Sequence, residues 1–92
     1  MAQLIKANGV VQKVQPKEGN QFSLQELQDF VNGYIEIIYL PEGKCLVVNE
    51  EGKVRGLPIN KWASNLIRNT PGFQRLDTVV GDVLYCNQKD ID

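Results

Sequence analysis

The sequence contains no histidine, the residue that most often serves as a general base, a zinc ligand or a member of a catalytic triad. It has only two cysteines, Cys45 and Cys86, and these lack the CxxC spacing of redox and zinc motifs. Each lies in a strand-like apolar run, so we expect buried structural thiols in a reducing compartment, with a disulfide as the alternative. These absences favour a protein that is not an enzyme and uses no cofactor or metal.

Long apolar runs and a strong net charge are also missing. No run approaches the roughly 20 residues needed to cross a bilayer, and the first residues carry no signal-peptide core. Lysine and arginine number 10 against 11 acidic residues, so a formal net charge of −1 gives no strong nucleic-acid signal. We therefore expect a cytoplasmic protein that makes no membrane contact.

The remaining composition is that of a folded domain. Of 92 residues, 42% are hydrophobic and 23% are charged, which is ordinary for a globular protein. This length predicts one small domain over residues 1–92, with frayed ends at 1–2 and 87–92. Neither GxGxxG nor GxxxxGK[ST] occurs, so the sequence gives no signal for a dinucleotide or P-loop site.

The first predicted helix lies in FSLQELQDFVNG, residues 22–33. Ser23 and Glu26 have the spacing of a capping box, in which the hydroxyl and the carboxylate each accept a free backbone N–H. Gly33 is placed to end this helix in a left-handed conformation.

A second helix is predicted within LPINKWASNLIRN, residues 57–69. Asn60 is the favoured N-cap, and Pro58 at the first helical position is the alternative. Apolar residues recur at helical spacing, and we expect the face that carries Trp62 to close the core.

The other segments indicate antiparallel strands. Asn8-Gly9 predicts a hairpin within residues 3–15, and Gly81-Asp82 predicts a bulge or turn within the last strand. The remaining predicted strands are 34–40, 45–49, 53–55 and 79–86. The expected fold is α+β and two-layer, an antiparallel, mainly meander sheet of about five or six strands with two helices packed on it.

Three segments carry a resemblance to a known family: NGYIEIIYL (32–40), VVNEEGKVRGLPIN (47–60) followed by Ala63, and DTVVGDVLY (77–85). In their order and spacing they resemble small uncharacterised proteins, known only as a domain of unknown function, of bacteriophages and mobile elements of Gram-positive bacteria. The resemblance implies a mobile-element setting and supplies no catalytic residue. Small phage proteins without enzymatic motifs commonly act by stoichiometric binding.

Residues 49–61 form the candidate ligand site. If 53–55 is a strand, its two cations share one side, and the following helix start favours an anion. Asparagine amides can read a base edge and a tyrosine can stack on a base. The expected ligand-binding residues are Asn49, Lys53, Arg55, Asn60, Lys61 and Tyr34.

Each of these residues also has a structural interpretation. Asn49 can stabilise a turn and Asn60 can serve only as a cap. Lys53 and Arg55 can guard a sheet edge, and Tyr34 is a good strand former.

The carboxylates give no clear catalytic pattern. Glu36, among isoleucines, is expected to face solvent, as in ordinary strand alternation. Asp77 and Asp82 are only a weak magnesium pair, because no further ligand is near in sequence.

Two functions of different classes follow. The first is a phage or mobile-element protein that sequesters a small anionic ligand, most plausibly a nucleotide immune signal, to counter host defence. Because 92 residues enclose a nucleotide poorly, this function implies a homo-oligomer. The alternative is an inhibitor that binds a host protein through a sheet edge or a helix face.

Overall fold

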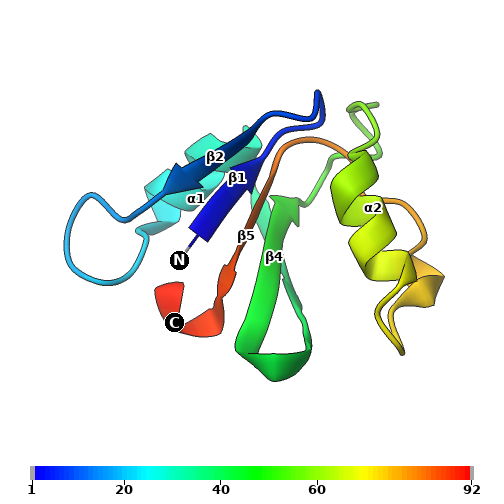
Figure 1. The fold of residues 1–92 in the computed structure, drawn as a ribbon. Coiled ribbons are helices and arrows are strands. Elements are labelled where there is room, and N and C mark those ends of the chain that lie inside the picture. The colour runs from blue at the N-terminus through cyan, green and yellow to red at the C-terminus, as the bar shows by residue number, and fades with distance from the viewer. Residues whose placement is uncertain (1, 92) are drawn as a thin grey trace.

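A computed structural model describes residues 2–91 as an antiparallel sheet with two helices packed on it (Figure 1). The strands are β1 (Ala2–Ile5), β2 (Val11–Val14), β3 (Ile35–Tyr39), β4 (Lys44–Asn49) and β5 (Val83–Asn87). The helices are α1 (Leu24–Val31) and α2 (Lys61–Arg68), and short 3₁₀ turns cover Pro41–Gly43, Gln74–Leu76 and Gln88–Asp90. None of the helices between residues 2 and 91 combines the length and the apolarity that a membrane span requires.

The sheet consists of two hairpins joined by the last strand. The strand order is β2-β1-β5-β4-β3, and every neighbouring pair is antiparallel. The predicted hairpin at Asn8-Gly9 is confirmed: β1 pairs with β2, and Gly9 takes φ 95°. The predicted α+β class, a meander-like antiparallel sheet with two helices, is also confirmed.

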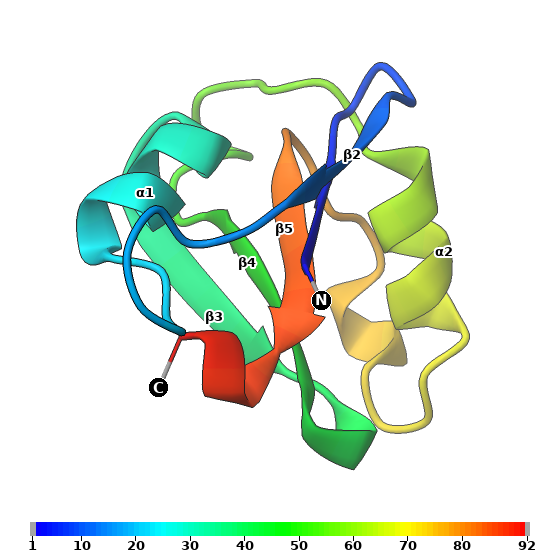
Figure 2. The same ribbon diagram turned by 60° about the vertical axis from the view of Figure 1, so that its left-hand side comes forward.

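The helices lie on opposite faces of the sheet, so the two-layer expectation is wrong and the sheet is the middle of three layers (Figure 2). Alternate residues of β4 pack into different clusters. The α1-side cluster comprises Ala2, Phe22, Leu27, Val31, Cys45, Val47, Leu84 and Cys86. The α2-side cluster comprises Ile5, Leu40, Leu46, Val48, Ala63, Ile67, Val79 and Val83. Because both faces are covered, β4 is buried from Cys45 to Asn49.

The start of α1 is as predicted. The Ser23 hydroxyl accepts the Glu26 N–H at 3.1 Å, and the Glu26 carboxylate accepts the Ser23 N–H at 2.9 Å. The Lys17 N–H also donates to this carboxylate. The hydrogen bond from the Ser23 N–H has the larger effect, and the two together hold the pKa of the Glu26 carboxyl below its usual range. The end of α1 differs, because Asn32 and not Gly33 takes the left-handed conformation, with φ 65°. Asparagine tolerates this region better than other side chains do.

Helix α2 begins as predicted and packs differently. The Asn60 side chain accepts the Ala63 N–H, so Asn60 is the N-cap and the Pro58 alternative is wrong. Trp62 does not close the core: it is 40% exposed and meets Tyr85 edge-on, with ring centroids 5.2 Å apart. The buried face of α2 is one position further along the helix and centres on Ala63 and Ile67.

Four further segments differ from the sequence prediction. Residues 53–55 are part of a turn and not a strand. The last strand begins at Val83, after a turn at Gly81 with φ 79°, and Val80 forms only an isolated bridge with Ile59. Ala2 is buried in β1, and residues 87–91 are ordered rather than frayed, since the Asp90 carbonyl accepts the Phe22 N–H at 2.8 Å. Residues 1 and 92 lie outside the described range.

Candidate functional site

Asn49 ties the end of α1 to the turn that follows β4. It is buried, its amide nitrogen donates to the Val31 carbonyl at 3.0 Å, and its side-chain oxygen accepts the Glu51 N–H at 2.8 Å. The hydrogen bonds therefore fix the loop against the helix end. A ligand that used this amide would have to displace them.

Arg55 and Gly33 complete the same junction. The Arg55 guanidinium donates to the Asn32 carbonyl at 2.9 Å, at the C-terminal end of α1. A β-carbon at Gly33 would lie 2.8 Å from Asn49 Nδ2 and 3.0 Å from Arg55 Nη1. Glycine is needed here because of this close approach and not because of its backbone angle.

Asn60 joins α2 to the sheet. It is 1% exposed, and besides capping α2 its amide nitrogen donates to the Ile5 and Gly81 carbonyls, each at 2.9 Å. Ser64, which the sequence analysis did not single out, also exchanges hydrogen bonds with the Val79 backbone at 3.1 and 2.8 Å. A serine beside Ala63, on the buried face of the helix, is the signal for this contact.

Lys53, Arg55, Lys61 and Tyr34 are the exposed members of the predicted site. Lys61 is the exposed first residue of α2. Tyr34 is 64% exposed and lines a depression that also contains Asp29 and Glu51. Of the predicted residues, only Asn49 and Lys53 line a pocket on the α2 face of the sheet. The structure therefore brings Asn49 and Arg55 together at the end of α1, whereas Asn60 and Lys61 lie at the start of α2.

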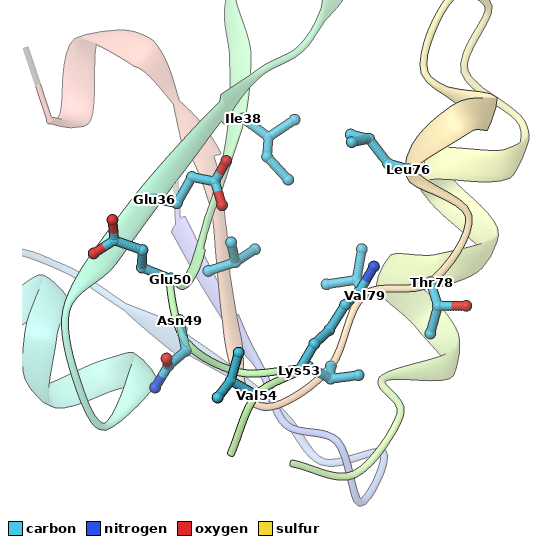
Figure 3. Close-up of a pocket in the computed structure, with 11 residues that line it drawn as sticks. Glu36, Ile38, Asn49, Glu50, Lys53, Val54, Leu76, Thr78 and Val79 are labelled. Carbon is cyan, nitrogen blue, oxygen red and sulfur yellow. The ribbon is translucent and has the colours of Figure 1, made fainter. Parts of the chain in front are cut away.

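A pocket of about 180 Å³ lies on the α2 face of the sheet, between β3 and the segment that leads into β5 (Figure 3). We call it the β3 groove. Its lining is Glu36, Ile38, Val48, Asn49, Glu50, Lys53, Val54, Leu76, Thr78, Val79 and Val80. The groove exists because α2 covers the central strands and leaves the α2 face of β3 partly uncovered.

Ile38 and Leu76 point toward each other across the β3 groove (Figure 3). The carboxylate of Glu36 faces the same space, whereas that of Glu50 points away from it (Figure 3). Lys53 extends along the opposite wall, and its amino end lies beside Val79 (Figure 3). Glu36 is exposed, as predicted, and it supplies negative charge to an apolar groove.

β3 is one end of the strand order, so within residues 2–91 only β4 pairs with it. The Tyr34 carbonyl accepts the Glu50 N–H, and the Leu40 N–H donates to the Lys44 carbonyl, each at 2.9 Å. These two bonds show which backbone groups of β3 point toward β4. In an antiparallel pair, residues whose N–H and C=O groups point toward the partner strand alternate with residues whose groups point away from it. Ile35, Ile37 and Tyr39 therefore aim their backbone N–H and C=O groups at the open edge.

The two cysteines are neighbours on β4 and β5. Their sulfur atoms lie 3.6 Å apart, and both residues are buried in the α1-side cluster as thiols that are not joined in a disulfide. The hydrogen bond with Cys45, together with burial, raises the pKa of the Cys86 thiol far above its usual range. Neither thiol reaches solvent in the native fold.

The acidic residues form no metal site in the described part of the chain. Residues 2–91 contain no group of three histidine, cysteine, aspartate or glutamate side chains that can hold a metal ion. Asp82 instead accepts the Ala7 N–H at 2.9 Å and fastens the β1–β2 hairpin to the turn before β5.

Comparison with known proteins gives one family. Residues 4–92 match the family described as Domain of unknown function (DUF3846). The chain belongs to this family. Among curated proteins and among solved structures, none matches it. Membership in DUF3846 supports the resemblance to an uncharacterised domain and assigns no ligand.

Proposed function

We propose that this DUF3846 protein is a non-enzymatic binding module that captures an extended segment of a partner protein at the open edge of β3. In this mode a peptide adds a strand to a sheet, and its backbone supplies much of the affinity. The resemblance to phage and mobile-element proteins suggests the setting, a stoichiometric inhibitor of a host protein in the host cytoplasm.

The orientation of the β3 backbone carries this proposal. The outward N–H and C=O groups of Ile35, Ile37 and Tyr39 offer hydrogen bonds along the whole strand. Ile37 packs against the α1-side cluster and Ile38 against the α2-side cluster. An added strand would extend the sheet and cover apolar surface on both of its faces.

The other open edge fits this role less well. β2 is the opposite end of the strand order, and it carries Gln12 and Lys13, both exposed. An edge lysine is a common protection against strand addition. A strand added there would meet valine only at the two ends of β2, Val11 and Val14, with polar side chains between them.

Charge favours a partner protein over a second copy of this chain. Glu36 lies on β3, and Glu50 pairs with the residue before it. Two identical acidic edges repel each other at low salt, whereas a basic segment is attracted. A homo-oligomer through β3 is the competing occupant, and the concentration dependence of the molecular mass tests it.

Sequestration of a nucleotide has less support. Asn49 and Asn60 are buried and hydrogen-bonded to the backbone. The β3 groove, at about 180 Å³, is smaller than the roughly 300 Å³ at which drug-sized sites begin. Glu36 also faces this groove and repels phosphate (Figure 3).

The test replaces one backbone donor on the open edge. Tyr39→Pro removes an outward N–H that the ladder to β4 does not use, and edge strands tolerate proline at such a position. Tyr39→Thr is the matched control, because it removes the ring and keeps the N–H. The wild-type protein and both variants are immobilised and used to select from a random peptide library.

The proposal expects the wild-type protein and Tyr39→Thr to enrich related peptides, and Tyr39→Pro to bind those peptides at least about tenfold more weakly. Circular dichroism confirms that all three proteins are folded. Equal binding by Tyr39→Pro would exclude strand addition at β3. Enrichment of no peptide by the wild-type protein would reject the proposed function.

A further inference from the structure

We infer that the β3 groove selects the partner segment through a basic residue opposite Glu36 and an aliphatic residue opposite Ile38. This inference rests on the proposed function, because it assumes that a strand is added to β3. It goes further by naming the chemistry that the bound segment must carry.

The direction of the β3 backbone groups places Glu36 and Ile38 at positions where their side chains lie closest to those of an added strand and so select its residues best. Their backbone groups are directed toward β4, so in an added antiparallel strand the residues opposite them form non-hydrogen-bonded pairs. In such pairs the Cα atoms are only about 4.5 Å apart and the side chains are closest. Both side chains lie on the α2 face, so their partners in the added strand enter the β3 groove.

The shape and charge of the groove fit a long cationic side chain. Ile38 and Leu76 form an apolar passage, and the Glu36 carboxylate stands beside it (Figure 3). Lysine and arginine pack their aliphatic stems on apolar surface and keep the charged end near polar groups. A charge-assisted hydrogen bond to Glu36 would then fix the cation.

Lys53 limits how much positive charge the groove accepts. Its amino end lies beside Val79, on the wall across from Glu36 (Figure 3). A second cation in the segment, placed deeper in the groove, would meet Lys53. The expected motif is therefore one basic residue and not a basic run.

The α1 face of the added strand contributes affinity with less selectivity. Opposite Ile35, Ile37 and Tyr39 the pairs are hydrogen-bonded, and apolar or β-branched side chains suit the neighbouring surface. Read along an antiparallel segment, an aliphatic residue opposite Ile38 comes two positions before the basic residue opposite Glu36. Apolar residues occupy the positions before, between and after these two.

The experiment reverses one charge and compares it with a matched reversal outside the groove. Glu36→Lys changes the residue that faces the groove, and Glu42→Lys makes the same change in the exposed turn after β3. Both variants, with the wild-type protein, select from the same random peptide library. Peptides chosen by the wild-type protein are then titrated against all three.

The expected result is a switch of charge at one position. Wild type and Glu42→Lys enrich lysine or arginine two residues after an aliphatic position, whereas Glu36→Lys enriches aspartate or glutamate there. Wild-type peptides should bind Glu36→Lys on the order of fivefold more weakly, the size expected for one cross-strand charge pair. Their affinity for Glu42→Lys should change less than twofold.

Two outcomes separate this inference from the proposed function. Peptides that need the Tyr39 N–H and show no charge preference at this position would overturn the inference and leave strand addition in place. Equal effects of Glu36→Lys and Glu42→Lys would also overturn it, because only general attraction would remain. Peptides insensitive to Tyr39→Pro, or none enriched by wild type, would remove both proposals.

Discussion

At the residue scale, Asn49 and Asn60 show how one side-chain type serves two levels of structure. Each has a local role that its sequence neighbours indicate, a turn for Asn49 and a helix cap for Asn60. Each also donates to a distant carbonyl, Val31 at 18 positions and Ile5 at 55 positions of separation. The local role was predictable from the sequence, whereas the distant partner depends on which strands meet, and the sequence pattern does not specify that.

Replacement of Asn60 tests this double role. Asn60→Ala removes the cap and leaves the buried Ile5 and Gly81 carbonyls without their donor. Chemical denaturation should show that the free energy of unfolding falls by about 3 kcal/mol, because the variant loses a helix cap and leaves a buried acceptor unsatisfied. A loss below about 1 kcal/mol would show that capping alone matters.

The Asn60→Asp variant separates cap from donor. Its carboxylate still accepts the Ala63 N–H, but it faces two carbonyl oxygens without a proton to donate. The folded state therefore raises the pKa of this new carboxyl, and the stabilisation by its proton appears as the pH falls below the folded value. Stability measured from neutral to acidic pH should rise relative to Asn60→Ala, and parallel curves would contradict the buried donor role.

At the element scale, the segment after β4 shows why alternation alone misleads. Lys53-Val54-Arg55 reads as a short strand, yet it forms a turn in which Gly56 takes φ 68° and Val54 is 92% exposed. Arg55 and Asn49 fix this turn to the end of α1 through backbone carbonyls. Three residues give too little periodicity to predict a strand against such side-chain anchors.

The anchored turn makes Gly33→Ala costly. The added methyl group would approach Asn49 Nδ2 at 2.8 Å, so we expect a loss of about 1–3 kcal/mol by overpacking. After Asn49→Ala has removed the obstacle, the same substitution should cost less. A double-mutant cycle measured by chemical denaturation reports this coupling, and additive effects would contradict the close approach.

At the scale of the whole molecule, the sequence of β4 contains a signal for the three layers. The run CLVV of β4 has no polar residue to face solvent, which is typical of a strand covered on both faces. The open edge of β3 shows the opposite case. Which backbone groups point outward depends on the register with β4, and the sequence gives no direct information about that register.

The two clusters should unfold together because they share β4 and β5. Trp62 reports on the α2 side, while Cys45 and Cys86 report on the α1 side. Tryptophan fluorescence and pulsed alkylation of the thiols should give the same denaturant midpoint, as expected for a small two-state domain. Alkylation at a lower denaturant concentration than the fluorescence change would show that the α1 layer opens separately.

The position of β5 has a consequence for the way the chain acquires its fold during synthesis. This strand is the last of the five in chain order, yet it lies in the middle of the sheet and joins the β1–β2 hairpin to the β3–β4 hairpin (Figure 1). While the chain grows on the ribosome, β1 and β4 each present an unpaired edge of the kind that invites aggregation. The sheet is completed only when residues 83–87 leave the exit tunnel, so a pause in synthesis before Val83 has emerged leaves both edges exposed.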